Sequence, residues 1–172
     1  MKALKQPRLG HLQRHFVLLA GAFGICAAAP ALAALGGDPL NAPPGATATN
    51  AVVRAAVAGS GASSASASSY TVRSTTLASG TIVNEYLSTE GTVFGIAWRG
   101  PRVPDLATLL GSYFPQYQQG LLAQRAERGA RGQVSVQDSG LVVRSGGHMG
   151  AFAGSAYLPQ SLPAGVSASD IQ

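Results

Sequence analysis

From Tyr70 onward, apolar and polar residues alternate in short runs that are separated by turn-forming residues. The runs over 70–77, 81–88 and 92–98 are rich in Thr, Val, Ile and Tyr, which favour the pleated backbone of a strand. Gly80 and Gly91 stand between these runs, and glycine permits the positive φ that tight hairpin turns require. The pattern therefore predicts three strands joined by two short turns.

The third run is apolar or small on both of its faces. Strand alternation places Phe94, Ile96 and Trp98 on one face, and Val93, Gly95 and Ala97 on the other. Large side chains on the first face would form the main core, and small ones on the second would let another element approach closely. We expect a central strand with both faces covered.

A helical pattern follows Pro104. Apolar residues then recur at i, i+3, i+4 and i+7, at Leu106, Leu109, Leu110 and Tyr113. Pro104 suits the first turn of a helix, and the Asp105 carboxylate would face its free amide groups. Pro115 is expected to stop or kink this helix, with a weaker continuation across Gly120.

Further strands are expected over 133–137, 141–145 and 149–157. Segments joined by such short turns need no parallel crossover. The predicted fold class is α+β: an antiparallel β-meander of about five or six strands with one kinked helix packed on a face.

The chain before Tyr70 has a different composition. Residues 34–69 contain no aromatic residue and are dominated by Ala, Gly, Ser, Pro and Thr, which gain little on burial. We therefore expect a flexible low-complexity segment over 34–69, with a short helix around 51–58 as its one element of local order. One globular domain would span 70–158, followed by a loose C-terminal tail over 159–172.

The first 33 residues have the pattern of a secretory signal peptide. Four basic residues precede an apolar run over 16–29, and Ala31-Leu32-Ala33 supplies the small residues of a cleavage site. The alternative is an uncleaved membrane anchor, but Pro30 ends the run short of the about 20 residues that span a bilayer. We expect cleavage after Ala33, a periplasmic or secreted location, and no integral membrane span after cleavage.

Removal of this leader changes the charge and the cysteine count. The whole chain has a formal net charge of +5, but cleavage would leave eight arginines and no lysine against seven acidic residues. Such a balance gives no support for a nucleic-acid partner. The single cysteine, Cys26, would leave with the leader, so stability has to come from packing and not from disulfides.

Few residues of the expected mature chain carry catalytic chemistry. His148 is its one histidine, so neither a metal site nor a cofactor is expected. A hydrolase could combine His148 with a serine and with Asp105, Asp138 or Glu85, although the Gly-x-Ser-x-Gly pattern is absent. Carboxylates in mid-strand and turn positions usually lie on a solvated face. We assign no catalytic residue.

Four residues are candidates for binding: Trp98, Arg99, Arg102 and His148. Aromatic residues and arginines are favoured at binding hot spots, so Trp98 beside two arginines could contact a carbohydrate or a peptide. The alternative for Trp98 is a core position that it shares with Phe94 and Ile96.

Several segments resemble one exported proteobacterial family, the domain of unknown function 2844, which is typical of Burkholderia-like bacteria. The resemblance rests on Ala34-Leu35-Gly36-Gly37, Tyr70-Thr-Val-Arg73, Ser79-Gly80-Thr81 with Glu85-Tyr86, the run 91–101, the run 104–115, and 145–149 with 152–154. It covers nearly the whole chain after the leader, apart from the Ala/Ser-rich stretch. The resemblance implies an exported location and fold relatives, and it transfers no activity and no site residue.

Three functions are compatible with these features. The leading hypothesis is a small exported soluble protein that acts by binding an envelope or secreted protein, or as an envelope accessory. The alternative is a small extracytoplasmic hydrolase that uses His148 with a nearby carboxylate. A third is a surface-attached structural or adhesive subunit that uses the segment before Tyr70 as a spacer.

Overall fold

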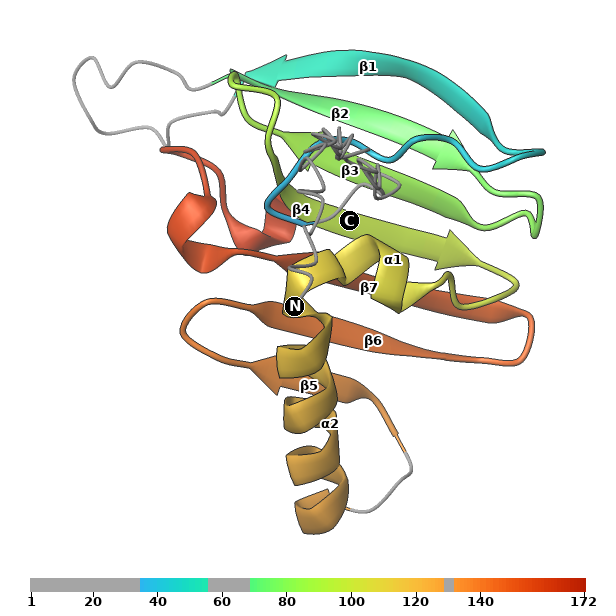
Figure 1. Cartoon of the computed structure of the whole chain (residues 1–172), viewed down its shortest axis with the longest axis vertical. Helices are drawn as coiled ribbons and strands as arrows, with labels where there is room; N and C mark the ends of the chain where they lie inside the picture. The colour runs from blue at the N-terminus through green and yellow to red at the C-terminus, as the bar shows by residue number, and fades with distance from the viewer. Residues whose placement is uncertain (1–34, 56–68, 129–131) are drawn as a thin grey trace, which may run out of the picture.

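A computed structural model of the chain describes residues 35–55, 69–128 and 132–172 (Figure 1). Its centre is a seven-stranded antiparallel sheet with the order β1-β2-β3-β4-β7-β6-β5. The strands are β1 (Thr47–Ala55), β2 (Ser69–Thr76), β3 (Ile82–Leu87), β4 (Val93–Gly100), β5 (Val134–Gln137), β6 (Val142–His148) and β7 (Ala151–Tyr157). The predicted α+β class is confirmed, with slightly more strands than expected.

β4 lies at the centre of the sheet, between β3 and β7, as the small and large residues on its two faces predicted. The distribution of its side chains differs from strict alternation, however. Tyr86 pairs with Gly95 and Leu87 with Val93, so Phe94 is an extra residue in a β-bulge. The prediction that Phe94 shares a face with Ile96 and Trp98 is wrong, because the bulge moves Phe94 to the opposite face.

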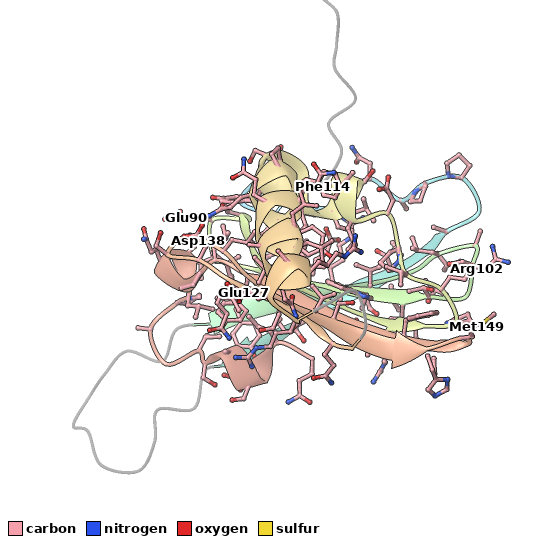
Figure 2. The ribbon with its side chains drawn as sticks, turned by 90° about the horizontal axis from the view of Figure 1, so that it is seen from below. Glu90, Arg102, Phe114, Glu127, Asp138 and Met149 are labelled. Atoms are coloured by element: carbon pink, nitrogen blue, oxygen red, sulfur yellow. The ribbon has the colours of Figure 1, made fainter. Side chains whose placement is uncertain are left out.

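One face of the sheet, which we call the helix side, carries α1 (Leu106–Leu110), the short 3-10 turn η1 (Gly111–Tyr113) and α2 (Phe114–Arg128) (Figures 1 and 2). The Asp105 carboxylate caps α1, since it accepts hydrogen bonds from the Ala107 N–H at 3.0 Å and from the Thr108 hydroxyl at 2.6 Å. Pro115 lies in the first turn of α2, where no intrahelical N–H is needed. The kinked helix is confirmed: the chain bends at η1 and Pro115 begins its second part.

Residues 35–40, which we call the N-terminal strap, belong to the core on the helix side. Leu35 and Leu40 are 1% and 4% exposed. The Leu35 N–H donates to the Leu109 carbonyl at 3.0 Å, and Gly36 and Gly37 exchange backbone hydrogen bonds with Val93 at 2.8 and 3.0 Å. Two buried leucines and these backbone hydrogen bonds together hold the segment against α1 and β4.

The strap and β1 correct the prediction of a flexible segment over 34–69. β1 pairs with β2 along its length and forms one edge of the sheet, and its strand conformation reaches Ala55 where a short helix was expected. Backbone pairing stabilises a strand even where its side chains are small, which composition alone did not reveal. The rest of that segment, residues 56–68, and the expected signal peptide over 1–33 lie outside the described residues.

The opposite face of the sheet, which we call the outer face, is partly covered by the C-terminal segment, residues 159–172. Val166 and Ile171 pack there against Tyr70, Tyr86 and Phe94. The Tyr86 hydroxyl donates to the Gln172 carbonyl at 2.7 Å and accepts from the Gln172 N–H at 2.9 Å. The prediction of a loose tail over 159–172 is wrong, because its few apolar residues complete an aromatic cluster.

The second edge strand, β5, has its outward-facing backbone groups paired with a side chain of α2. The Gln124 amide donates to the Gln133 carbonyl at 2.9 Å, and its oxygen accepts from the Ser135 N–H at 3.0 Å. A side-chain amide thus takes the place of a further strand at this short edge. Within the described part of the chain, no helix is long and apolar enough to cross a membrane.

Candidate functional site

Trp98, the aromatic binding candidate, is buried in the core of the helix side. It is 2% exposed and belongs to the same cluster as Ile96 and Val83. Its ring lies against Gly154, with which Trp98 pairs across β4 and β7. The indole Nε1 is buried and has no hydrogen-bond partner among the described residues. Trp98 therefore contributes to packing and is not accessible to a ligand in this conformation.

The other three binding candidates come together at one end of the sheet. Arg99 is followed by the loop 101–104, and Gly100 pairs with Phe152, whose other partner is Gly147. The β6–β7 turn with His148 therefore leaves the sheet beside the loop with Arg102. All three side chains are exposed, and Figure 2 places Arg102 and Met149 at the same end of the molecule. We call this set, together with Val103 and Met149, the basic end.

The backbone of Arg102 is held by Thr81, a buried residue in the turn that precedes β3. The Thr81 hydroxyl donates to the Arg102 carbonyl at 2.7 Å, and Thr81 is fully buried. Gly80 lies next to Pro101 across the same two loops. Because its backbone is held in this way, the loop 101–104 presents Arg102 and Val103 from a fixed position.

A groove of about 610 Å³ runs over the outer face of β5, β6 and β7, beside the part that the C-terminal segment covers. Ser155 pairs on one side with Ala97, which packs in the aromatic cluster of the outer face, and on the other side with Arg144. Arg144 and Ser155 therefore point to the outer face. The lining residues are Gln133, Val134, Ser135, Gln137, Arg144, Ser145, Gly146, Gly147, Ala151, Ala153, Gly154 and Ser155, with no acidic residue among them.

Two residues of the basic end border this groove. Arg99 pairs with Ala153, and His148 pairs with Ala151. Arg144, which sequence reasoning missed, stands between them and the β5 edge. Its signal in the sequence is a single arginine directly after two valines, Val142 and Val143, in an expected strand.

Two of the three carboxylates that a hydrolase could use, Asp138 and Glu85, are separated from His148. The His148 ring contacts the Met149 carbonyl through Nδ1 at 3.1 Å. Asp138 lies at the opposite end of the sheet from Met149 (Figure 2), and Glu85 is buried beneath the strap.

Asp105 and Asp138 are both engaged as hydrogen-bond acceptors. The Thr108 hydroxyl and the backbone N–H groups of the α1 cap hold the pKa of Asp105 below its ordinary value. The amide of Gln116, with the Ser139 N–H and hydroxyl, does the same for the pKa of Asp138. Within the described ranges, no group of three or more His, Cys, Asp or Glu side chains could hold a metal ion.

Glu85 is the one carboxyl buried in the described core, which corrects the expectation that a mid-strand acid lies on a solvated face. It is 0% exposed, and its Oε1 accepts the Leu40 N–H of the strap at 2.6 Å. Its Oε2 has no hydrogen-bond partner among the described residues. Burial raises the pKa of Glu85, and the Leu40 hydrogen bond and the charge of Arg73 oppose this rise.

This environment makes stability depend on pH with a definite sign. Because the folded state keeps the Glu85 proton to a higher pH than the unfolded chain does, folded protein binds more protons in that window. We expect the free energy of unfolding to fall as pH rises from about 4.5, the ordinary pKa, to the raised value. Replacement of Glu85 by Gln should remove this pH dependence. The free energy of unfolding of the variant should therefore rise relative to that of the parent as pH rises through the window.

Urea titrations followed by Trp98 fluorescence at several pH values would measure this dependence. The matched control is Glu127→Gln on the exposed surface of α2, which should follow the parent at every pH. A Glu85→Gln variant whose stability tracks the parent through the window would contradict the assignment.

One of the three comparisons with known proteins identifies a family, and none supplies an activity. The model of the family described as "Protein of unknown function (DUF2844)" matches residues 31–171. Neither the search of curated proteins nor that of solved structures found a match. The matched region contains the strap, the whole sheet, the groove and the basic end. The chain therefore belongs to the DUF2844 family.

Proposed function

We propose that this is an exported, non-catalytic protein that binds an acidic, extended segment of another envelope or secreted protein in the outer-face groove. The observation that carries the proposal is the composition of the groove. Most of its lining residues are Gly, Ala or Ser, its charged residue is Arg144, and none of its described lining residues is acidic. An anionic segment would meet favourable charge there and no opposing carboxylate.

The shape of the groove favours a polypeptide. Small side chains at Gly146, Ala151 and Ala153 let a chain approach the sheet closely. The C-terminal segment already packs on the neighbouring part of the same face, so the outer face is suited to covering by peptide. No aromatic residue lines the groove, which disfavours the stacking that carbohydrate ligands use.

The export part of the proposal rests on the leader pattern over 1–33. Its basic residues, apolar run and small cleavage residues are those of a secretory signal. The hydrolase alternative is less well supported, because Asp105 accepts hydrogen bonds in the α1 cap, Asp138 accepts one from Gln116, and Glu85 lies on the other face. Mass spectrometry of extracytoplasmic protein should find a mature chain that begins at Ala34.

Site-specific photocrosslinking in cells tests the groove. A photoreactive amino acid in place of Ala153 is expected to form an adduct with one partner, whereas the same group in place of Leu122 on α2 should not. Arg144→Glu should lower the yield about tenfold, since reversal of a charge at an interface commonly costs more than 1.4 kcal/mol. Arg125→Glu on the exposed surface of α2 is the matched control.

An adduct at Ala153 that survives Arg144→Glu unchanged would contradict the electrostatic basis of binding. Equal adducts at the Ala153 and Leu122 positions would contradict the groove itself. Turnover of a substrate that His148→Ala abolishes would replace the proposal by the hydrolase alternative.

A further inference from the structure

We propose that the basic end is a peripheral membrane-docking surface, which inserts Met149 and Val103 into an anionic lipid interface while Arg99 and Arg102 contact the headgroups. This inference goes beyond the proposed function and uses the end of the sheet that adjoins the groove. It rests on the apolar residues that this end exposes, on the charges around them and on the rigidity of the two turns.

The described residues include three exposed large hydrophobic side chains, and two of them lie at the basic end. Met149 is 92% exposed and Val103 is 44% exposed. Met149 lies at the apex of the β6–β7 turn, and Val103 lies in the loop between β4 and α1. The third, Leu122, is on α2, on the helix side of the sheet.

The charge at this end suits an anionic partner. Arg99 and Arg102 are both exposed, and each arginine near an anionic membrane surface contributes favourably. Asp105 is the carboxylate that follows this loop, and its two oxygens are bonded to the Ala107 N–H and the Thr108 hydroxyl. Cations around protruding apolar side chains are typical of surfaces that lie in a membrane interface.

Both turns are held by the fold before any docking occurs. The Thr81 hydroxyl fixes the Arg102 carbonyl. The β6–β7 hairpin remains paired up to His148 and Ala151, and Gly150 supplies the positive φ of the turn. A preorganised surface loses little conformational entropy on binding, so two apolar side chains and two charges are sufficient for weak, reversible attachment.

A lipid surface fits this end better than a protein does. Protein partners favour concave, well-packed sites, and the outer-face groove is a site of that kind. At the basic end the apolar side chains instead lie at the tips of loops, where a flat, deformable interface can accept them. The two surfaces are separable, because Met149 and Val103 do not line the groove.

Vesicle co-sedimentation of the protein from Ala34 to the C-terminus tests the proposal. The probes are vesicles of zwitterionic phosphatidylcholine alone and the same vesicles with about one third phosphatidylglycerol. We expect sedimentation with the anionic vesicles only, weakened by 0.5 M salt. Arg102→Gln should reduce partitioning about fivefold, the equivalent of about 1 kcal/mol per arginine, and Met149→Ser should reduce it by at least a similar factor.

The matched controls are Arg125→Gln and Leu122→Ser, which remove an exposed charge and an exposed apolar side chain from α2. Both should bind vesicles like the parent. Absence of binding to anionic vesicles would overturn the proposal, as would a Met149→Ser variant that binds like the parent. Arg102-dependent retention on immobilised polyglutamate without vesicle binding would assign this end to an acidic protein and would also overturn it.

Discussion

A chain that begins at Ala46, and so lacks the N-terminal strap, is expected to lose cooperative folding. The deletion removes Leu35 and Leu40 from the core and leaves the backbone groups of Val93 without their strap partners. Loss of a buried leucine typically costs about 2–5 kcal/mol, and most domains have about 5–15 kcal/mol in all. The comparison is with a chain that begins at Ala34, followed by near-UV circular dichroism and by Trp98 fluorescence.

Single substitutions keep this test informative if the shortened chain aggregates. Leu35→Ala should lower the free energy of unfolding by about 2–5 kcal/mol, whereas Leu122→Ala, at a position 65% exposed, should change it by less than about 0.5 kcal/mol. Equal stability of the Ala34 and Ala46 chains would mean that the strap does not belong to the folded core.

Replacement of Gly154 by Val is expected to destabilise the protein by about 3 kcal/mol or more, at the upper end of overpacking effects. A Cβ at this position would lie 2.6 Å from the Arg144 carbonyl oxygen and still closer to the Trp98 ring. Neither neighbour can move easily, since the carbonyl belongs to β6 and the indole is enclosed by the core. Thermal unfolding should show a midpoint lower by about 10 °C.

Ala153→Val is the matched control, because it adds the same kind of side chain to the adjacent residue on the open outer face. It should leave stability nearly unchanged, since valine favours strands and this position is exposed. Gly154→Ala should lower the free energy of unfolding less in a Trp98→Leu background than in the parent. The smaller leucine side chain leaves room for the added methyl group. Additive losses would show that the Trp98 contact is not the cause.

Some features of the functional residues follow from the local sequence, and others depend on contacts between distant segments. Arg99, Arg102 and His148 could be named as exposed polar candidates from their turns, but only strand register brings them to one end of the sheet. Arg144 could be recognised as a groove residue only from its pairing with Ser155. Glu85 was misjudged, and the sequence left open whether Trp98 is a core or a binding residue, because a residue's accessibility depends on what covers its strand.

Local patterns along the chain were sufficient to predict the α+β class, the central position of β4, the capped and kinked helix, and the strands from Tyr70 to Tyr157. Each of these rests on the period of apolar residues or on turn and cap chemistry, which act over a few neighbouring positions. The strap and the C-terminal segment could be assigned to the core only from contacts between distant parts of the chain. Their apolar residues are sparse, and their partners are 45 and 86 residues away in the Leu40–Glu85 and Tyr86–Gln172 hydrogen bonds. The composition of a short segment gives no information about a surface formed by residues so distant in the sequence.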